Sequence, residues 1–323
     1  MADLRTEICG IELAHPVLNG SGTFDAIAAR RAFGDELYER FPFSAFVSKT
    51  ITPEPRAGNP PPRLYETPAG MINSIGLPNK GLRGFLDEDL PALAQLPVPL
   101  WVSVMAPSVD GFVHLVDGVS RRDEVAAIEL NVSCPNVESG LIVGEQPAET
   151  RSLLEALRDL TEKPLVVKLT PNVADPAPVA LAAEEAGADA VSLINTVRAH
   201  ALDPPTLEPW LGGGSGGLSG PAVRALALDQ VRRVAAAVAI PVVGMGGIES
   251  GADALALLAA GASAVAVGTA SFRDPMAADR IRSELAAELD SRGLGAPPTR
   301  RARTRERHRR AGAEAASGSS TSS

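Results

Sequence analysis

Short apolar runs recur along the chain, and turn residues bound each of them. Runs of this length and spacing predict buried β-strands. The eight expected strands are residues 16–18, 45–47, 100–104, 127–130, 165–169, 190–194, 240–243 and 264–267.

Helical patterns separate most of these strands. Residues 176–186 and 251–260 carry Ala and Leu at helical spacing and stop before Gly187 and Gly261, as a glycine after a helix predicts. Alternating strands and helices indicate parallel pairing. Eight such units without a G-x-G-x-x-G motif favour an α/β fold of the (β/α)₈ TIM-barrel type over a Rossmann sheet. We expect one barrel domain over residues 1–294.

Polar and small residues follow the expected strands, at the end where barrel enzymes place their sites. Each alone is an ordinary loop residue, but together they predict a polar rim. They are Asn19 to Gly22, Ser48 to Thr50, Ser103, Asn131 to Cys134, Lys168, Asn195 and Thr196, Gly244 to Gly247, and Gly268 and Thr269.

Cys134 lies in the most distinctive of these strand ends, within L-N-V-S-C-P-N (residues 130–136). Pro135 cannot continue a strand ladder, so the chain turns outward and presents the thiol beside Asn131 and Asn136. The pattern fits a catalytic cysteine, and equally a buried structural cysteine if taken alone.

Glycines follow the last two strands, at Gly246-Gly247 and Gly268-Thr269. Glycine lets backbone N–H groups approach an anion, and TIM barrels often hold a phosphate at this place. Tight turns are the simpler interpretation. A third cluster, residues 216–220, favours phosphate, and residues 212–214 are expected to form a mobile loop.

Two lysines, Lys49 and Lys168, stand at strand ends. Exposed rim positions would explain both. Lys168 follows an apolar run, however, and a lysine inside a barrel is costly unless it meets an anion. Such a cation could stabilise negative charge on a cofactor or an acidic substrate.

Residues 51–98 are too long for an ordinary βα connection. Their prolines predict an ordered segment with little regular structure. We expect this insertion after the second strand to cover the barrel mouth, where Asn73 and the N–H groups of residues 75–77 could hold a carboxylate. A purely structural cover is the alternative.

Composition narrows the function classes. The net charge of −9 conceals a basic C-terminus, since residues 300–323 carry +5 and residues 1–299 carry −14. The acidic body disfavours a nucleic-acid partner. No apolar run is long enough to span a membrane, and no signal peptide is apparent. We expect residues 295–323 to be a disordered Arg-rich, then Ala/Gly/Ser-rich, tail; a basic nucleic-acid-binding arm is the alternative.

The chain has only two cysteines, Cys9 and Cys134, and four histidines without metal-ligand spacing. This usage fits a reducing cytoplasm and predicts no metal site.

Taken in order, these motifs resemble those of class 1 dihydroorotate dehydrogenases, the flavin enzymes of pyrimidine synthesis, over about residues 3–290. The resemblance rests on N-G-S-G-T-F (19–24), Ser48 to Thr50, residues 56–81, N-V-S-C-P-N (131–136), Lys168, Asn195-Thr196, G-G-L-S-G-P (216–221), G-M-G-G (244–247) and Gly268-Thr269. Cys134 points to class 1, and residues 54–60 with 216–221 look most like the 1B subclass. That subclass pairs with an iron–sulfur flavoprotein subunit and passes electrons to NAD⁺.

The resemblance implies a role for each matching position. Cys134 would remove the proton from C5 of dihydroorotate while hydride leaves C6 for FMN. The residues around dihydroorotate or orotate would be Lys49, Asn73, Ser74, Ile75, Gly76, Leu77, Asn131, Asn195 and Thr196. Those around FMN would be Ser21, Lys49, Thr50, Ser103, Asn131, Lys168, Ile194, Gly220, Gly246, Gly247, Gly268 and Thr269. A homodimer is implied, with FAD and a 2Fe-2S centre on a partner subunit only.

Two positions within the matched region depart from the family pattern. Ser103 stands where an asparagine is expected beside the flavin, and residues 197–212 differ in sequence. Three other functions stay open: a class 1A enzyme that reduces fumarate, a non-redox phosphate-binding barrel lyase or isomerase, and a non-catalytic binding scaffold.

Overall fold

The computed structural model describes residues 2–133 and 143–299. Eight parallel strands form the barrel wall in the order β3-β14-β13-β10-β9-β8-β7-β4. They are β3 (Val17–Asn19), β4 (Phe46–Val47), β7 (Leu100–Val104), β8 (Val125–Asn131), β9 (Leu165–Lys168), β10 (Ala190–Leu193), β13 (Val242–Met245) and β14 (Ala264–Val267). The predicted barrel is confirmed, with the seventh strand displaced two residues towards the C-terminus.

The seam between β3 and β4 is closed without a regular strand ladder. The Ser44 N–H donates to the Val17 carbonyl over 3.0 Å. The buried Asn19 side chain then accepts from the Val47 N–H and donates to the Val47 carbonyl, both at 2.8 Å. One amide thus replaces a backbone pair across the seam.

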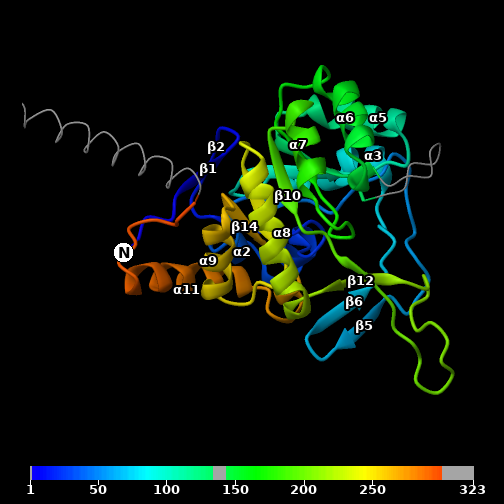
Figure 1. Ribbon diagram of the computed structural model, residues 1–323. Coiled ribbons are helices and arrows are strands. Elements are labelled where there is room, and N and C mark those ends of the chain that lie inside the picture. The colour runs from blue at the N-terminus through cyan, green and yellow to red at the C-terminus, as the bar shows by residue number, and fades with distance from the viewer. Residues whose placement is uncertain (1, 134–142, 300–323) are drawn as a thin grey trace, which may run out of the picture.

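Helices surround the barrel on its outer side (Figure 1). They are α1 (Ala26–Phe33), α2 (Glu36–Glu39), α5 (Val109–Ser120), α6 (Pro147–Arg158), α7 (Ala177–Glu185), α8 (Arg224–Ala237), α9 (Gly251–Ala260), α10 (Ala270–Arg273) and α11 (Ala277–Ser291), with short 3₁₀ turns at Val143–Glu145 and Pro221–Val223. Ser250 caps α9 by accepting from the Asp253 N–H. Gly187 and Gly261 follow α7 and α9 with positive φ angles, as predicted.

A small hairpin closes the N-terminal end of the barrel. It consists of β1 (Thr6–Ile8) and β2 (Ile11–Leu13). Ile8 and Leu13 are buried and pack with the apolar side chains inside the barrel, such as Trp101. The Cys9 thiol donates to the Asp189 carbonyl, directly before β10. This end is therefore filled by apolar side chains.

A four-stranded antiparallel sheet covers the opposite end, in the order β11-β12-β6-β5. Its strands are β5 (Leu64–Thr67), β6 (Gly70–Asn73), β11 (Val197–Ala199) and β12 (Gly216–Ser219). The predicted cover thus contains a regular hairpin, followed by α3 (Gly81–Gly84), a π-helical turn (Phe85–Asp89) and α4 (Leu90–Leu93). The expectation of little regular structure was wrong, and the cover also draws strands from residues 197–219.

The glycines before residue 220 serve this cover. Gly216 and Gly217 lie in β12 and pair with β11 and β6. A Cβ at Gly217 would fall 1.9 Å from Thr196 Oγ1, and one at Gly212 would fall 2.1 Å from the Pro60 carbonyl oxygen. Gly216, Gly217 and Gly212 therefore permit close packing, where the sequence suggested a phosphate site and a mobile loop.

Candidate active site

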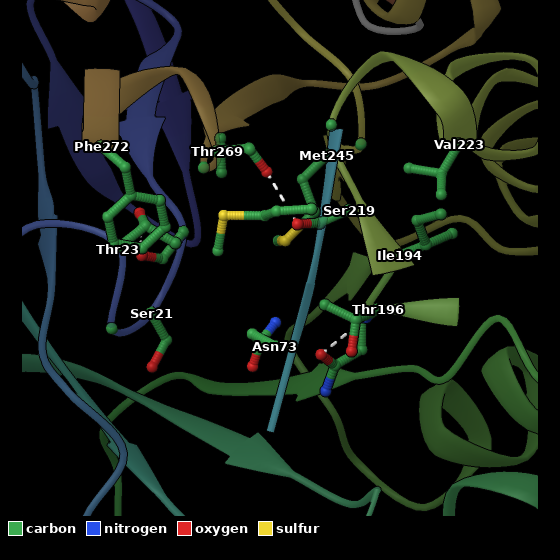
Figure 2. A pocket seen from close by; sticks show the side chains of 18 of the residues that line it. Ser21, Thr23, Asn73, Ile194, Thr196, Ser219, Val223, Met245, Thr269 and Phe272 are labelled. Atoms are coloured by element: carbon green, nitrogen blue, oxygen red, sulfur yellow. Dashed lines mark hydrogen bonds between the residues drawn. The ribbon is translucent and has the colours of Figure 1, made fainter. Parts of the chain in front are cut away.

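A cavity of about 410 Å³ lies at the carboxyl ends of the barrel strands, under the cover sheet. Figure 2 shows its side chains converging from separate elements: Ser21 after β3, Asn73 from β6, Thr196 after β10, and Ser219 and Thr269 from the last third of the chain. Its volume falls in the usual range for small-molecule sites. Its place is that of TIM-barrel active sites.

Most of the predicted site residues meet at this cavity. Those in its lining are Ser21, Lys49, Thr50, Asn73, Ile75, Gly76, Leu77, Asn131, Lys168, Ile194, Asn195, Thr196, Gly220, Gly246, Gly247, Gly268 and Thr269. Residues more than 200 positions apart are thus brought to one site by the barrel topology.

Two predicted residues that the structure describes, Ser74 and Ser103, are not in the lining. Ser74 is buried beside it, where its hydroxyl accepts from Asn59 Nδ2 over 3.0 Å. Ser103 lies within β7 and is fully buried. Cys134 lies outside the described residues, as do Pro135 and Asn136.

Glycines line the side of the cavity formed by the last strands. Gly220, Gly246 and Gly247 have φ angles of +93°, +131° and +73°, which L-residues with side chains rarely adopt. Nearby, Thr269 Oγ1 donates to Ser219 Oγ over 2.9 Å (Figure 2). Backbone and hydroxyl groups are accessible here, as a phosphate group requires.

Asparagine side chains mark another part of the cavity. Asn195 donates to Asn131 Oδ1 and to Ser133 Oγ, at 3.3 and 3.0 Å. Asn73 reaches in from the cover and donates to the Gly217 carbonyl over 3.2 Å. These amides can pair with the ring N–H and carbonyl groups of a polar planar ligand.

The two cavity lysines differ in their surroundings. Burial lowers the pKa of Lys49 below its usual value of 10.5, and the nearby charge of Lys168 lowers it further. Lys168 is buried, and its Nζ lies 3.7 Å from Glu129 Oε1. Two lysines in one cavity attract an anionic ligand.

Some of the lining was not predicted. Thr23 and Glu249 add polar groups, and Phe272 adds apolar surface. Met245, within the predicted rim segment 244–247, lines the cavity without having been predicted as a site residue. Glu129, just below the cavity, was also missed. It had a visible signal, since it is the only charged residue within the strand V-A-A-I-E-L-N. The apolar residues had none, because core and cavity side chains look alike in sequence.

The described residues contain no group of three or more His, Cys, Asp or Glu side chains arranged to hold a metal ion. Within those same two ranges, no helix is both long and apolar enough to cross a membrane.

Comparison with known proteins gives one consistent family. The family model for dihydroorotate dehydrogenase matches residues 3–289. A relative from Solibacter usitatus, provisionally named dihydroorotate dehydrogenase A (fumarate), is 46% identical and covers 90% of this chain and 95% of its own. Catalytic subunits named dihydroorotate dehydrogenase B (NAD⁺) are 43% identical in Geobacter metallireducens and 42% in Geobacillus kaustophilus. The alignments cover 90% and 91% of this chain, and 95% and 93% of those proteins. The chain therefore belongs to the dihydroorotate dehydrogenase family.

Proposed function

We propose that this chain oxidises (S)-dihydroorotate to orotate in de novo pyrimidine biosynthesis. The observation that carries the proposal is the polar cavity at the carboxyl end of the barrel. Two lysines, three asparagines and a glycine-rich wall meet there, in a chain that matches the family model over residues 3–289.

FMN is the cofactor on which the family generally depends, and the cavity suits it. Gly246 and Gly247 pack closely against α8, where side chains would meet Ala227 and Arg224 at 2.6 and 2.8 Å, and both also line the cavity, where backbone groups can contact a phosphate. FMN, when bound, supplies the two-electron acceptor. The residues that would hold it are Ser21, Lys49, Thr50, Asn131, Lys168, Ile194, Gly220, Gly246, Gly247, Gly268 and Thr269, with Ser103 acting through Thr50, whose Oγ1 lies 3.0 Å from Ser103 Oγ.

Dihydroorotate is an acid with ring amide groups, and the remaining cavity residues complement both features. The Lys49 ammonium can pair with its carboxylate. Asn73, Asn131 and Asn195 can orient the ring by hydrogen bonds. Ile75, Gly76, Leu77 and Thr196 also line the cavity, and Ser74 lies beside it, bonded to Asn59.

Cys134 is the proposed base that takes the proton from C5. The described chain leads towards it through Asn131 and Ser133, and Asn195 donates to both side chains. The Asn195 amide thus fixes the side chains at and directly after the end of β8. A thiol has a reference pKa of about 8.5, so proton abstraction at neutral pH needs surroundings that favour the thiolate.

The electron acceptor divides two versions of the proposal. We favour NAD⁺, reached through an iron–sulfur flavoprotein subunit that carries FAD and a 2Fe-2S centre, because several relatives are named as catalytic subunits of the B enzyme. Fumarate is the second candidate, because the Solibacter relative carries that name. A homodimer in the cytoplasm is part of the proposal.

Anaerobic addition of L-dihydroorotate to the purified, FMN-loaded chain tests the substrate reaction. Bleaching of the flavin absorbance is the expected result, and NAD⁺ with the partner subunit, or fumarate alone, can then be tested for reoxidation. A flavin that stays oxidised would overturn the substrate assignment. Failure to bind FMN at all would favour a non-redox phosphate-binding barrel enzyme.

A further inference from the structure

Glu129 is a buried carboxylate that the proposed reaction does not use. It lies on β8 with 2% of its surface exposed. The flanking Ile128 and Leu130 pack outward against the helices, whereas Ala127 packs inside the barrel. Because strand side chains alternate, Glu129 also points into the barrel, in the layer just below the cavity.

Three side chains from β7, β9 and β10 surround this carboxylate. Ser103 on β7 donates to Oε1 over 3.0 Å, and Ser192 on β10 donates to Oε2 over 3.1 Å. Lys168 on β9 places its Nζ 3.7 Å from Oε1. All three are buried. A buried charge persists only when it is paired and hydrogen-bonded, and both conditions are met here.

The Glu129 carboxylate is connected to the cavity through two of these side chains, Lys168 and Ser103. Lys168 lines the cavity itself. Ser103 Oγ also lies 3.0 Å from Thr50 Oγ1, which is 3.0 Å from Ser21 Oγ, and both Thr50 and Ser21 line the cavity. Ser103, which replaces the asparagine expected from the family pattern, is the link between Thr50 and the carboxylate.

We propose that Glu129 is a positioning residue that fixes the Lys168 ammonium and the Thr50 hydroxyl at the cavity floor and offsets the lysine charge. This inference rests on the proposed function, because it requires FMN to bind in this cavity. A flavin there then meets a neutral ion pair in place of a free cation. Since reduction adds negative charge to the flavin, the carboxylate holds the reduction potential lower than Lys168 alone would set it.

The charge-removing variant Glu129→Gln tests this inference through the midpoint potential of bound FMN. The amide keeps the shape and most hydrogen bonds. We expect the reduction equilibrium to shift at least about tenfold towards reduced flavin, which is about 30 mV for a two-electron couple. The matched control is Glu162→Gln, an exposed residue before the amino end of β9. A shift no larger than the control's, or one in the opposite direction, would overturn the inference.

A double-mutant cycle with Lys168→Met separates positioning from a general effect on folding. Glu129→Gln should weaken FMN binding severalfold in the wild-type background and much less when Lys168 is already methionine. Equal losses in both backgrounds would contradict a role through Lys168.

If Glu129→Gln alone does not fold, the midpoint potential of bound FMN is compared between Lys168→Met and the double variant Lys168→Met/Glu129→Gln. The double variant buries neither charge. The double variant should then show the more positive potential, and equal potentials would overturn the inference. Failure of the wild-type chain to bind FMN would overturn both this inference and the proposed function. Unchanged potentials in an FMN-loaded protein would remove this inference alone.

Discussion

The two ends of the barrel differ in the polarity of their side chains. At the amino end, the β1–β2 hairpin inserts Ile8 and Leu13, and apolar side chains fill the space. At the carboxyl end, the cover sheet stands over a cavity lined by lysines, asparagines and glycines. The first arrangement gains free energy from burial. The second gives up that gain to keep ligand-binding groups free, so stability and function are separated along the barrel axis.

Cys134→Ala, three residues after β8 in the sequence, should have the largest effect on function. Removal of a general base lowers turnover by about 10²–10⁴-fold, while FMN binding and the thermal midpoint should stay close to wild type. Steady-state turnover with dihydroorotate measures the loss. Cys9→Ser changes the other cysteine, in the hairpin at the amino end, and should leave turnover unchanged. Near-normal activity of the alanine variant would remove Cys134 from the mechanism.

Ile8→Ala should lower the stability of the protein and leave its FMN affinity unchanged. The side chain is fully buried, and its truncation should cost about 2–5 kcal/mol of unfolding free energy. Urea unfolding measures this, and FMN affinity at a temperature where the variant is folded should be unchanged. Leu207→Ala, at a side chain that is 70% exposed, should change stability by less than about 0.5 kcal/mol. Strongly weakened FMN binding in Ile8→Ala would contradict the separation of the two ends.

Lys49→Met should weaken orotate binding about 10–100-fold, because a charge-assisted hydrogen bond is lost. The lowered pKa of Lys49 gives a second signature. Wild-type affinity should fall as pH rises towards this lowered value, before an ordinary lysine would lose its proton, and the variant should lack that decline. Orotate titrations across pH measure both. Arg83→Met, at an exposed side chain in α3, is the control, and an unchanged affinity in Lys49→Met would exclude a contact with the carboxylate.

His15, at the amino end of the barrel, should have a smaller effect on the free energy of unfolding, and only at acid pH. Burial lowers its pKa from 6.5 to about 4, and Arg282 adds to the shift while Asp279 opposes it. In the unfolded chain His15 is protonated below pH 6.5, whereas in the folded chain it stays neutral down to about pH 4. The free energy of unfolding therefore decreases as the pH falls from 6.5 to 4. Between pH 7 and pH 5 the loss should be about 2 kcal/mol.

Urea midpoints at the two pH values measure this His15 contribution. His15→Asn should reduce the loss, whereas His114→Asn, at an exposed position on α5, should not. An identical pH dependence in wild type and His15→Asn would show that other groups cause the acid sensitivity.

The sequence by itself determined the eight barrel strands and most of the cavity lining. Strand burial is a local property, so apolar runs such as residues 100–104 and 264–267 mark it directly. The carboxyl ends of parallel strands meet at one rim, so Lys49, Asn131 and Lys168 could be assigned to one site before their positions were known.

Only the tertiary structure decided what these elements touch. The pairing of β6 with β12 joins segments about 145 residues apart, and no local pattern specifies it. The Asn19 bridge across the barrel seam and the Lys168–Glu129 pair likewise depend on neighbours distant in sequence. Hydrophobic patterns record whether a side chain is buried, whereas partner choice depends on distances that exist only after the chain has folded.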